Sequence, residues 1–236
     1  STQGYSSAAS DVYKRQLIEY MKGIAMNHLS HDNISLLQPS EGSVWNIDTL
    51  SRKIAVRALP YSDIFIDPGR GTSQVTSASR CNAATLLRPA PGGDFQFRST
   101  VKVEFGNTFD AGVLLLYVNE RSWAKLCFEY SPEREPMVVS VVNNGYTSDD
   151  ANAFTVSGQE VHLRISRKDN VFAFHASLDG QKWIFVRAFP LDVLNDAEQI
   201  LHIGFEAQAP NASGCEVEFS DFALVSGNVP DFRSGK

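Results

Sequence analysis

The sequence is poor in cysteine, with three such residues among 236. They are Cys81, Cys127 and Cys215, and their odd number and wide spacing exclude the disulfide framework typical of small secreted domains. Free thiols are typical of a reducing compartment. We therefore expect a cytoplasmic protein.

Long apolar runs and excess positive charge are also missing. The longest apolar run, residues 111–118, is far below the roughly 20 residues that a membrane-spanning helix needs. The sequence does not open with a charged segment followed by an apolar one, as a secretion signal would. Lys and Arg number 21 against 27 Asp and Glu, which gives a net charge of -6. Because a nucleic-acid surface needs clustered basic residues, we expect neither a nucleic acid nor a membrane as partner.

Motifs for metals, cofactors and covalent catalysis are not found. His28 and His31 are the only closely spaced histidines, and no Cys or Glu set completes a metal site around them. The glycine-rich stretch 69–73 lacks the Gly-Lys-Ser/Thr ending of a phosphate-binding loop, and no serine lies in a Gly-x-Ser-x-Gly elbow. We therefore expect no cofactor and no metal.

Alternating apolar and polar residues, by contrast, recur along the chain and predict β-strands. The clearest alternation covers residues 94–105, and residues 113–118 and 123–130 form a predicted hairpin around the polar turn 119–122. On its second strand, Ala124, Leu126 and Phe128 should face a core. About a dozen such strands predict an all-β fold, an antiparallel two-sheet β-sandwich.

The ends of the chain differ from this β region. Residues 1–16 are predicted to be a non-native or disordered leader, since residues 11–16 resemble a translated sequencing adapter. Helical spacing of apolar residues predicts a short N-terminal helix over 17–27, within a helix-and-linker region 17–40. The sandwich is expected over 41–226, followed by a tail, 227–236.

Four blocks, in chain order, resemble the DUF1349 family, also called the regulation-of-enolase protein family. They are DAGVLLLYVNERSWAKLCFEY, VVSVVNNGYTSDD, ASLDGQKWIFVRAF and EVEFSDFAL. The resemblance implies a concanavalin A-like lectin/glucanase fold, a jelly roll. The chain lacks the Trp that such proteins carry after Ser148-Asp149, and reads Asp63-Ile64-Phe65 where they have Asp-Phe-Trp.

A polar face on one sheet is the predicted binding site. Sandwiches of this resemblance often bind ligands across a concave sheet face, and a sugar site needs hydrogen-bonding groups beside an apolar platform. The candidate ligand-binding residues are Trp123, Lys125, Glu129, Asn143, Asn144, Tyr146, Asp149 and His175. The alternative is an ordinary outer face on which Lys125 and Glu129 form a solvated ion pair.

No catalytic residue is predicted. Glu216 and Glu218 are the only close acidic pair on one strand face, and alternation places them toward solvent. The sequence favours a non-catalytic, carbohydrate-binding module. Two alternatives stay open: a cytosolic regulatory protein whose protein partner is a metabolic enzyme such as enolase, and a glycoside hydrolase or an accessory domain of one.

Overall fold

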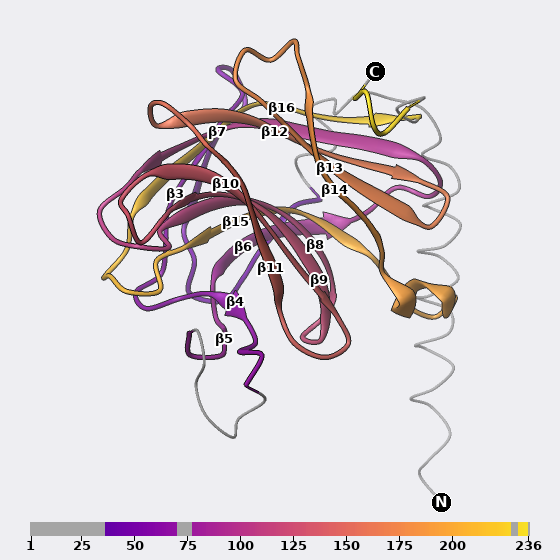
Figure 1. The fold of residues 1–236 in the computed structure, drawn as a ribbon, viewed down its shortest axis with the longest axis horizontal. Helices are drawn as coiled ribbons and strands as arrows, with labels where there is room; N and C mark the ends of the chain where they lie inside the picture. The colour runs from indigo at the N-terminus through magenta and orange to yellow at the C-terminus, as the bar shows by residue number, and fades with distance from the viewer. Residues whose placement is uncertain (1–35, 70–76, 228–230, 236) are drawn as a thin grey trace, which may run out of the picture.

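The computed structural model describes residues 36–69, 77–227 and 231–235. Within these residues, two seven-stranded antiparallel sheets stack as the layers of a sandwich (Figure 1). The predicted all-β sandwich is thus confirmed. The predicted leader 1–16 and helix 17–27 lie outside the described residues.

Sheet A has the strand order β1-β6-β15-β8-β9-β10-β11 and forms the lower layer in Figure 1. Its strands are β1 (Gln38–Pro39), β6 (Ala84–Pro89), β15 (His202–Gln208), β8 (Ala111–Asn119), β9 (Ser122–Tyr130), β10 (Pro136–Asn144) and β11 (Asp149–Thr155).

Sheet B has the order β14-β13-β12-β7-β16-β3-β2 and forms the upper layer. Its strands are β14 (Ile184–Pro190), β13 (Val171–Ser177), β12 (Glu160–Lys168), β7 (Phe95–Glu104), β16 (Glu216–Ser226), β3 (Lys53–Arg57) and β2 (Trp45–Asp48). A 3-10 turn, η1 (Asp192–Asn195), follows β14 in the chain.

The main core fills the space between the two sheets. Ala124, Leu126 and Phe128 point into it, as their alternation predicts. Phe205 of sheet A lies 4.7 Å, centroid to centroid, from Phe219 of sheet B. Such contacts between the inner faces hold the layers together.

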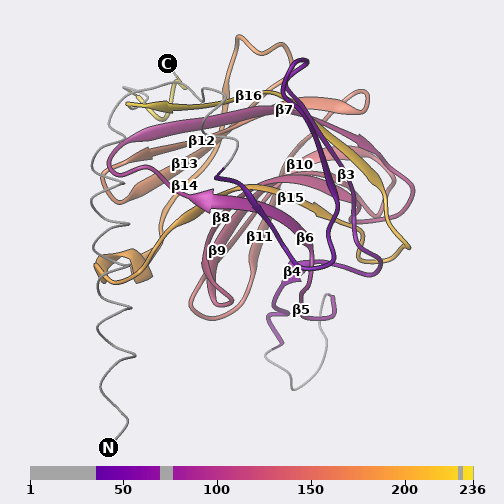
Figure 2. The same ribbon diagram turned by 180° about the vertical axis from the view of Figure 1, so that it is seen from behind.

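A second, smaller core covers the outer face of sheet A. Strands β4 (Ile64–Phe65) and β5 (Arg80–Cys81) pair with each other and lie against that face, as both ribbon views show (Figure 2). Ile64 packs there with Trp123 and Cys127. We call residues 59–67, which carry β4, the strap. Because the strap covers them, the centres of β8 and β9 are buried on both faces.

Two local features do not follow from apolar alternation. The polar sequence of β11 (Asp149–Thr155) carries no such alternation, yet it pairs with β10 at the edge of sheet A. The connection between β13 and β14 spans residues 178–183, and in it Asp179 Oδ1 accepts hydrogen bonds from the amides of Gln181 and Lys182, both at 2.8 Å.

Candidate functional site

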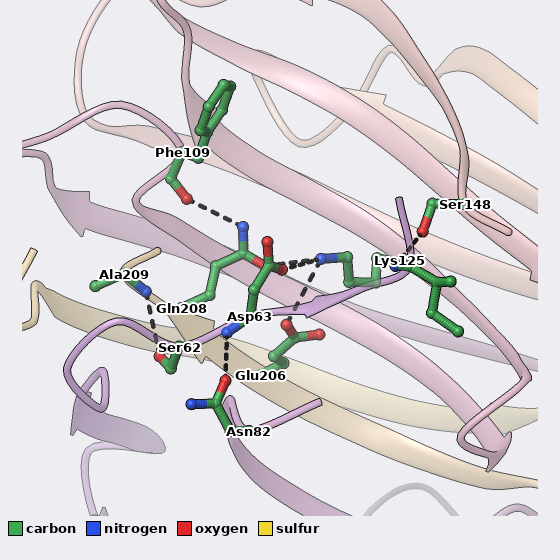
Figure 3. Close-up of polar contacts among 10 residues, drawn as sticks. Ser62, Asp63, Asn82, Phe109, Lys125, Ser148, Glu206, Gln208 and Ala209 are labelled. Carbon is green, nitrogen blue, oxygen red and sulfur yellow. Dashed lines mark hydrogen bonds and ion pairs between the residues drawn. The ribbon is translucent and has the colours of Figure 1, made fainter. Parts of the chain in front are cut away.

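The strap is fixed across sheet A by hydrogen bonds at both of its ends. The Ser62 amide donates to the Ala209 carbonyl at 3.3 Å. Near the other end, the Ile66 amide donates to Ser148 Oγ, and the Ser148 amide donates to the Ile66 carbonyl, both at 2.9 Å. Figure 3 shows the contact of the Ser148 hydroxyl and, at the other end, the hydrogen bond that the Ala209 amide donates to Ser62 Oγ at 3.4 Å. The strap is therefore part of the fold and determines which parts of sheet A are open.

Beneath the strap, Lys125 of β9 forms a buried ion pair with Asp63. Lys125 Nζ lies 2.8 Å from Asp63 Oδ1 and donates to Gln208 Oε1, also at 2.8 Å (Figure 3). Burial alone would lower the pKa of Lys125, but the carboxylates of Asp63 and Glu206 outweigh it, so the pKa is raised and the ammonium is kept. The solvated Lys125–Glu129 pair considered from the sequence is wrong, since the strap excludes water from Lys125.

Two further carboxyl groups face the same buried region. Glu206 is fully buried, and its Oε1 lies 3.8 Å from Lys125 Nζ. Burial raises the pKa of Glu206 to about 8, against the attraction of Lys125. Burial likewise raises the pKa of Glu129, which is half-buried at the end of β9, to about 8. Both groups hold protons at pH values where ordinary carboxyls are ionised.

An open cleft lies where the strap leaves sheet A. It has a volume of about 550 Å³ and is lined by residues 65–67, 79–81, 120–121 and 146–147. These residues come from the strap, from β5 and its approach, and from the β8–β9 and β10–β11 turns. Tyr146 is 72% exposed at this cleft, so an aromatic ring is accessible beside polar groups.

Trp123 and Asn143 lie side by side under the strap region. They are register partners in the β9–β10 pair, and both are fully buried. Trp123 Nε1 donates to the Glu120 carbonyl at 3.3 Å. The side-chain amide of Asn143 has no hydrogen-bond partner among the described residues. These two candidates therefore lie within sheet A and are not open to a ligand.

Asn144 and Asp149 connect the β10–β11 end of sheet A to neighbouring elements. Asn144 exchanges two hydrogen bonds, both 2.9 Å, with Asp192 at the start of η1. Asp149 forms an ion pair with Arg187 of β14, which belongs to the other sheet. Their polar groups are therefore engaged in packing the edge of the sandwich.

His175 lies apart from the other candidates, on the outer face of sheet B. It is fully buried, and its Nε2 contacts the Phe232 carbonyl of the segment 231–235 at 2.7 Å. Burial lowers the pKa of His175 to about 4, against the hydrogen bond to that carbonyl. Alternation placed His175 away from the core, but it could not tell which of the two outer faces it would join. Its expected convergence with Lys125, Glu129 and Asn143 is wrong.

The described part of the chain holds no group of three or more His, Cys, Asp or Glu side chains that could bind a metal. In the same part, no helix has the length and apolar character needed to cross a bilayer.

Sequence reasoning missed three residues of the buried cluster, namely Asp63, Glu206 and Gln208. A signal existed for two of them, since Glu206 and Gln208 alternate with the core residues Phe205 and Ala207. Asp63 carried no such signal, because it lies on a segment whose position depends on tertiary packing.

Among curated proteins, none matches this chain in sequence. Solved structures do match it in fold. The structure of a functionally unknown protein from Saccharomyces cerevisiae has 20% identity and a TM-score of 0.69, covering 83% of this chain and 99% of that chain.

Two kinds of carbohydrate-related protein share the fold at lower similarity. The GH43 BlXynB protein from Bacillus licheniformis has 12% identity and a TM-score of 0.56, covering 77% of this chain and 36% of that chain. A seed lectin from Lotus tetragonolobus has 12% identity and a TM-score of 0.52, covering 83% of this chain and 95% of that chain. The chain thus spans little more than a third of the GH43 protein. These likenesses confirm the lectin-like sandwich fold.

A family model described as "Protein of unknown function (DUF1349)" matches residues 40–226. This range covers the sandwich from β2 to β16, together with the strap and the cleft. The chain therefore belongs to the DUF1349 family.

Proposed function

We propose that this protein is a non-catalytic carbohydrate-binding module and that the cleft beside Tyr146 is its sugar site. The single observation that carries the proposal is this cleft of about 550 Å³ with an exposed aromatic ring. Its volume lies within the range of small-molecule sites, and an apolar ring face beside hydrogen-bonding groups is the combination that a sugar requires.

The polar groups of the cleft suit a neutral or mixed-charge sugar. Glu120 and Arg121 are exposed at the β8–β9 turn, and the hydroxyls of Ser79 and Thr147 lie on the opposite segments. Together they provide donors and acceptors around the ring of Tyr146. The shared fold with a lectin and a GH43 protein supports a sugar as the ligand.

A non-catalytic role is favoured by the state of the carboxyl groups. Glycoside hydrolysis requires two carboxyl groups flanking the bond that is cut. Asp67 in the cleft is buried and accepts a hydrogen bond from the Gly69 amide at 3.0 Å, which holds its own loop. Glu216 and Glu218 are on sheet B and pair with Arg57 and Lys53. Asp67 is thus engaged by its own loop, beside Glu120, the other carboxyl that lines the cleft, and Glu216 and Glu218 lie on the sheet that does not form the cleft.

A glycan array followed by calorimetry tests the proposal. We expect at least one glycan to bind with measurable heat and to be displaced by the free sugar. Absence of binding to every glycan on a broad array would count against the function.

A further inference from the structure

Lys125, Asp63 and Glu206 meet in the interior beneath the strap. Their side chains are 2%, 8% and 0% exposed, respectively. Charged groups are rarely buried to this degree unless they are paired, because removing them from water is unfavourable. The sugar site proposed above does not use them, so they call for a separate explanation.

Two contacts fix the position of the Lys125 amine, one to the Asp63 carboxyl and one to the Gln208 side chain. Its Nζ is 2.8 Å from Asp63 Oδ1 and 2.8 Å from Gln208 Oε1. Gln208 is itself oriented, since its Nε2 donates to the Phe109 carbonyl at 3.0 Å. The fixed approach of a nucleophile to a carbonyl carbon is what converts a slow bimolecular reaction into a fast intramolecular one.

Glu206 is placed as a proton carrier for this pair. Its Oε1 lies 3.8 Å from Lys125 Nζ, and neither of its oxygens has a hydrogen-bond partner among the described residues. Burial raises the pKa of Glu206 to about 8, so it binds a proton at a higher pH than an ordinary carboxyl does. A buried carboxyl that exchanges a proton near neutral pH, beside a reacting amine and carboxyl, is suited to general acid and base chemistry.

We propose that Lys125 and Asp63 condense in the folded protein into an amide that joins β9 to the strap, with Glu206 carrying the protons. The ion pair is the resting state, and the reaction proceeds from the minor form in which the ammonium proton has passed to the Asp63 carboxylate, because only the uncharged amine is a nucleophile. The amine then bonds to Asp63 Cγ, while Glu206 donates a proton to the carbonyl oxygen and takes one from the nitrogen.

Collapse of this tetrahedral intermediate completes the reaction. One Cγ–O bond breaks, and its hydroxyl leaves as water with a proton from Glu206, which regains a proton from the remaining hydroxyl. The net change is one amide formed and one water released, without any oxidant. The product closes a loop between residues 62 positions apart and fixes the strap covalently on sheet A.

The chain contains its own negative control in Lys53 and Glu218. These side chains are also in contact, at 2.9 Å, but are 50% and 35% exposed. Water solvates both groups of this exposed pair, so no amide is expected there.

Intact-mass spectrometry of the denatured wild-type chain is the first test. The expected mass is lower than the sequence mass by one water. An unchanged mass overturns the proposal. Because Asp179-Gly180 could also lose water as a cyclic imide, the site of the loss must be located.

Tryptic peptides locate it. An amide on Lys125 blocks cleavage there and joins residues 58–70 to residues 122–134, giving one species with the summed mass less one water. A lighter protein without this joined species contradicts the cross-link.

Variants test the role of each group. Lys125→Arg keeps the positive charge but not the reactive amine, and Glu206→Gln keeps the shape but not the acid. Both should have their full sequence mass, whereas Glu218→Gln should still lack one water. Complete cross-linking in Glu206→Gln would overturn the role of Glu206. If a variant does not fold, the intact mass and the tryptic peptides of the wild-type protein still show whether the cross-link exists.

Discussion

Lys125 of β9 contacts Asp63 of the strap at 2.8 Å, and the two residues lie 62 positions apart in the sequence. The contact fixes the strap over the outer face of sheet A. It thereby buries the middle of the sheet face that the sequence predicts as a binding surface, while the cleft beside Tyr146 stays open.

Replacing Lys125 by Met should therefore destabilise the protein strongly. Whether the amine is paired or joined in an amide, its loss leaves the Asp63 carboxyl buried without a partner. The expected decrease in the free energy of unfolding is about 3–5 kcal/mol. Urea denaturation of both proteins at the same pH measures it.

Lys53→Met is the matched control, since Lys53 pairs with Glu218 at the surface. Its decrease in the free energy of unfolding should be much smaller than that of Lys125→Met, because an exposed ion pair contributes little to stability. If both variants lowered the free energy of unfolding equally, burial of the Lys125 contact would have no energetic consequence.

Tyr146→Ala should weaken sugar binding at least about tenfold, equivalent to about 1.4 kcal/mol, because the ring supplies the apolar platform. Calorimetry with a glycan found on the array measures the change. Tyr61→Ala is the control, since Tyr61 is also exposed but does not line the cleft. Equal affinities of both variants and the wild type would remove Tyr146 from the site.

The stability of the protein should decrease as pH rises from about 4.5 to 8, in part through Glu206. Burial raises the pKa of Glu206 from 4.5 to about 8, so in this range the folded state binds more protons than the unfolded state. Glu206→Gln removes this difference and should give a shallower decrease. Denaturation curves at several pH values test it, and parallel slopes for the two proteins would contradict the assignment.

His175 should make the protein less stable as the pH falls, which is opposite to the effect of Glu206. Its pKa is lowered from 6.5 to about 4 by burial, so between these values the unfolded state binds more protons and stability decreases as pH falls. His175→Gln should show a smaller loss between pH 7 and pH 4.5. A loss in His175→Gln as large as in the wild type would argue against His175.

The sandwich could be predicted because its strands alternate. Residues 94–105 and 122–130 place apolar groups on one face at every second position, and that periodicity depends only on local geometry. The edge strand β11 was missed because both of its faces are polar or exposed. Its place in the sheet depends on backbone pairing with β10.

The candidate site was only partly predictable for a related reason. Alternation shows that Lys125 points away from the main core, but not that a segment 62 positions earlier covers it. Alternation also shows that His175 points away from the main core, but not that its strand, β13, belongs to sheet B. Tyr146 alone among the eight candidates lines the open cleft. An enolase partner and a cytoplasmic location stay predictions from the sequence.

The most direct test of the binding site is a nuclear magnetic resonance titration of the isotope-labelled protein with a glycan that it binds. The account predicts concentration-dependent shifts of the amides of Glu120, Arg121, Tyr146 and Thr147, with little change on sheet B. Shifts confined to the outer face of sheet B, around His175, would contradict it.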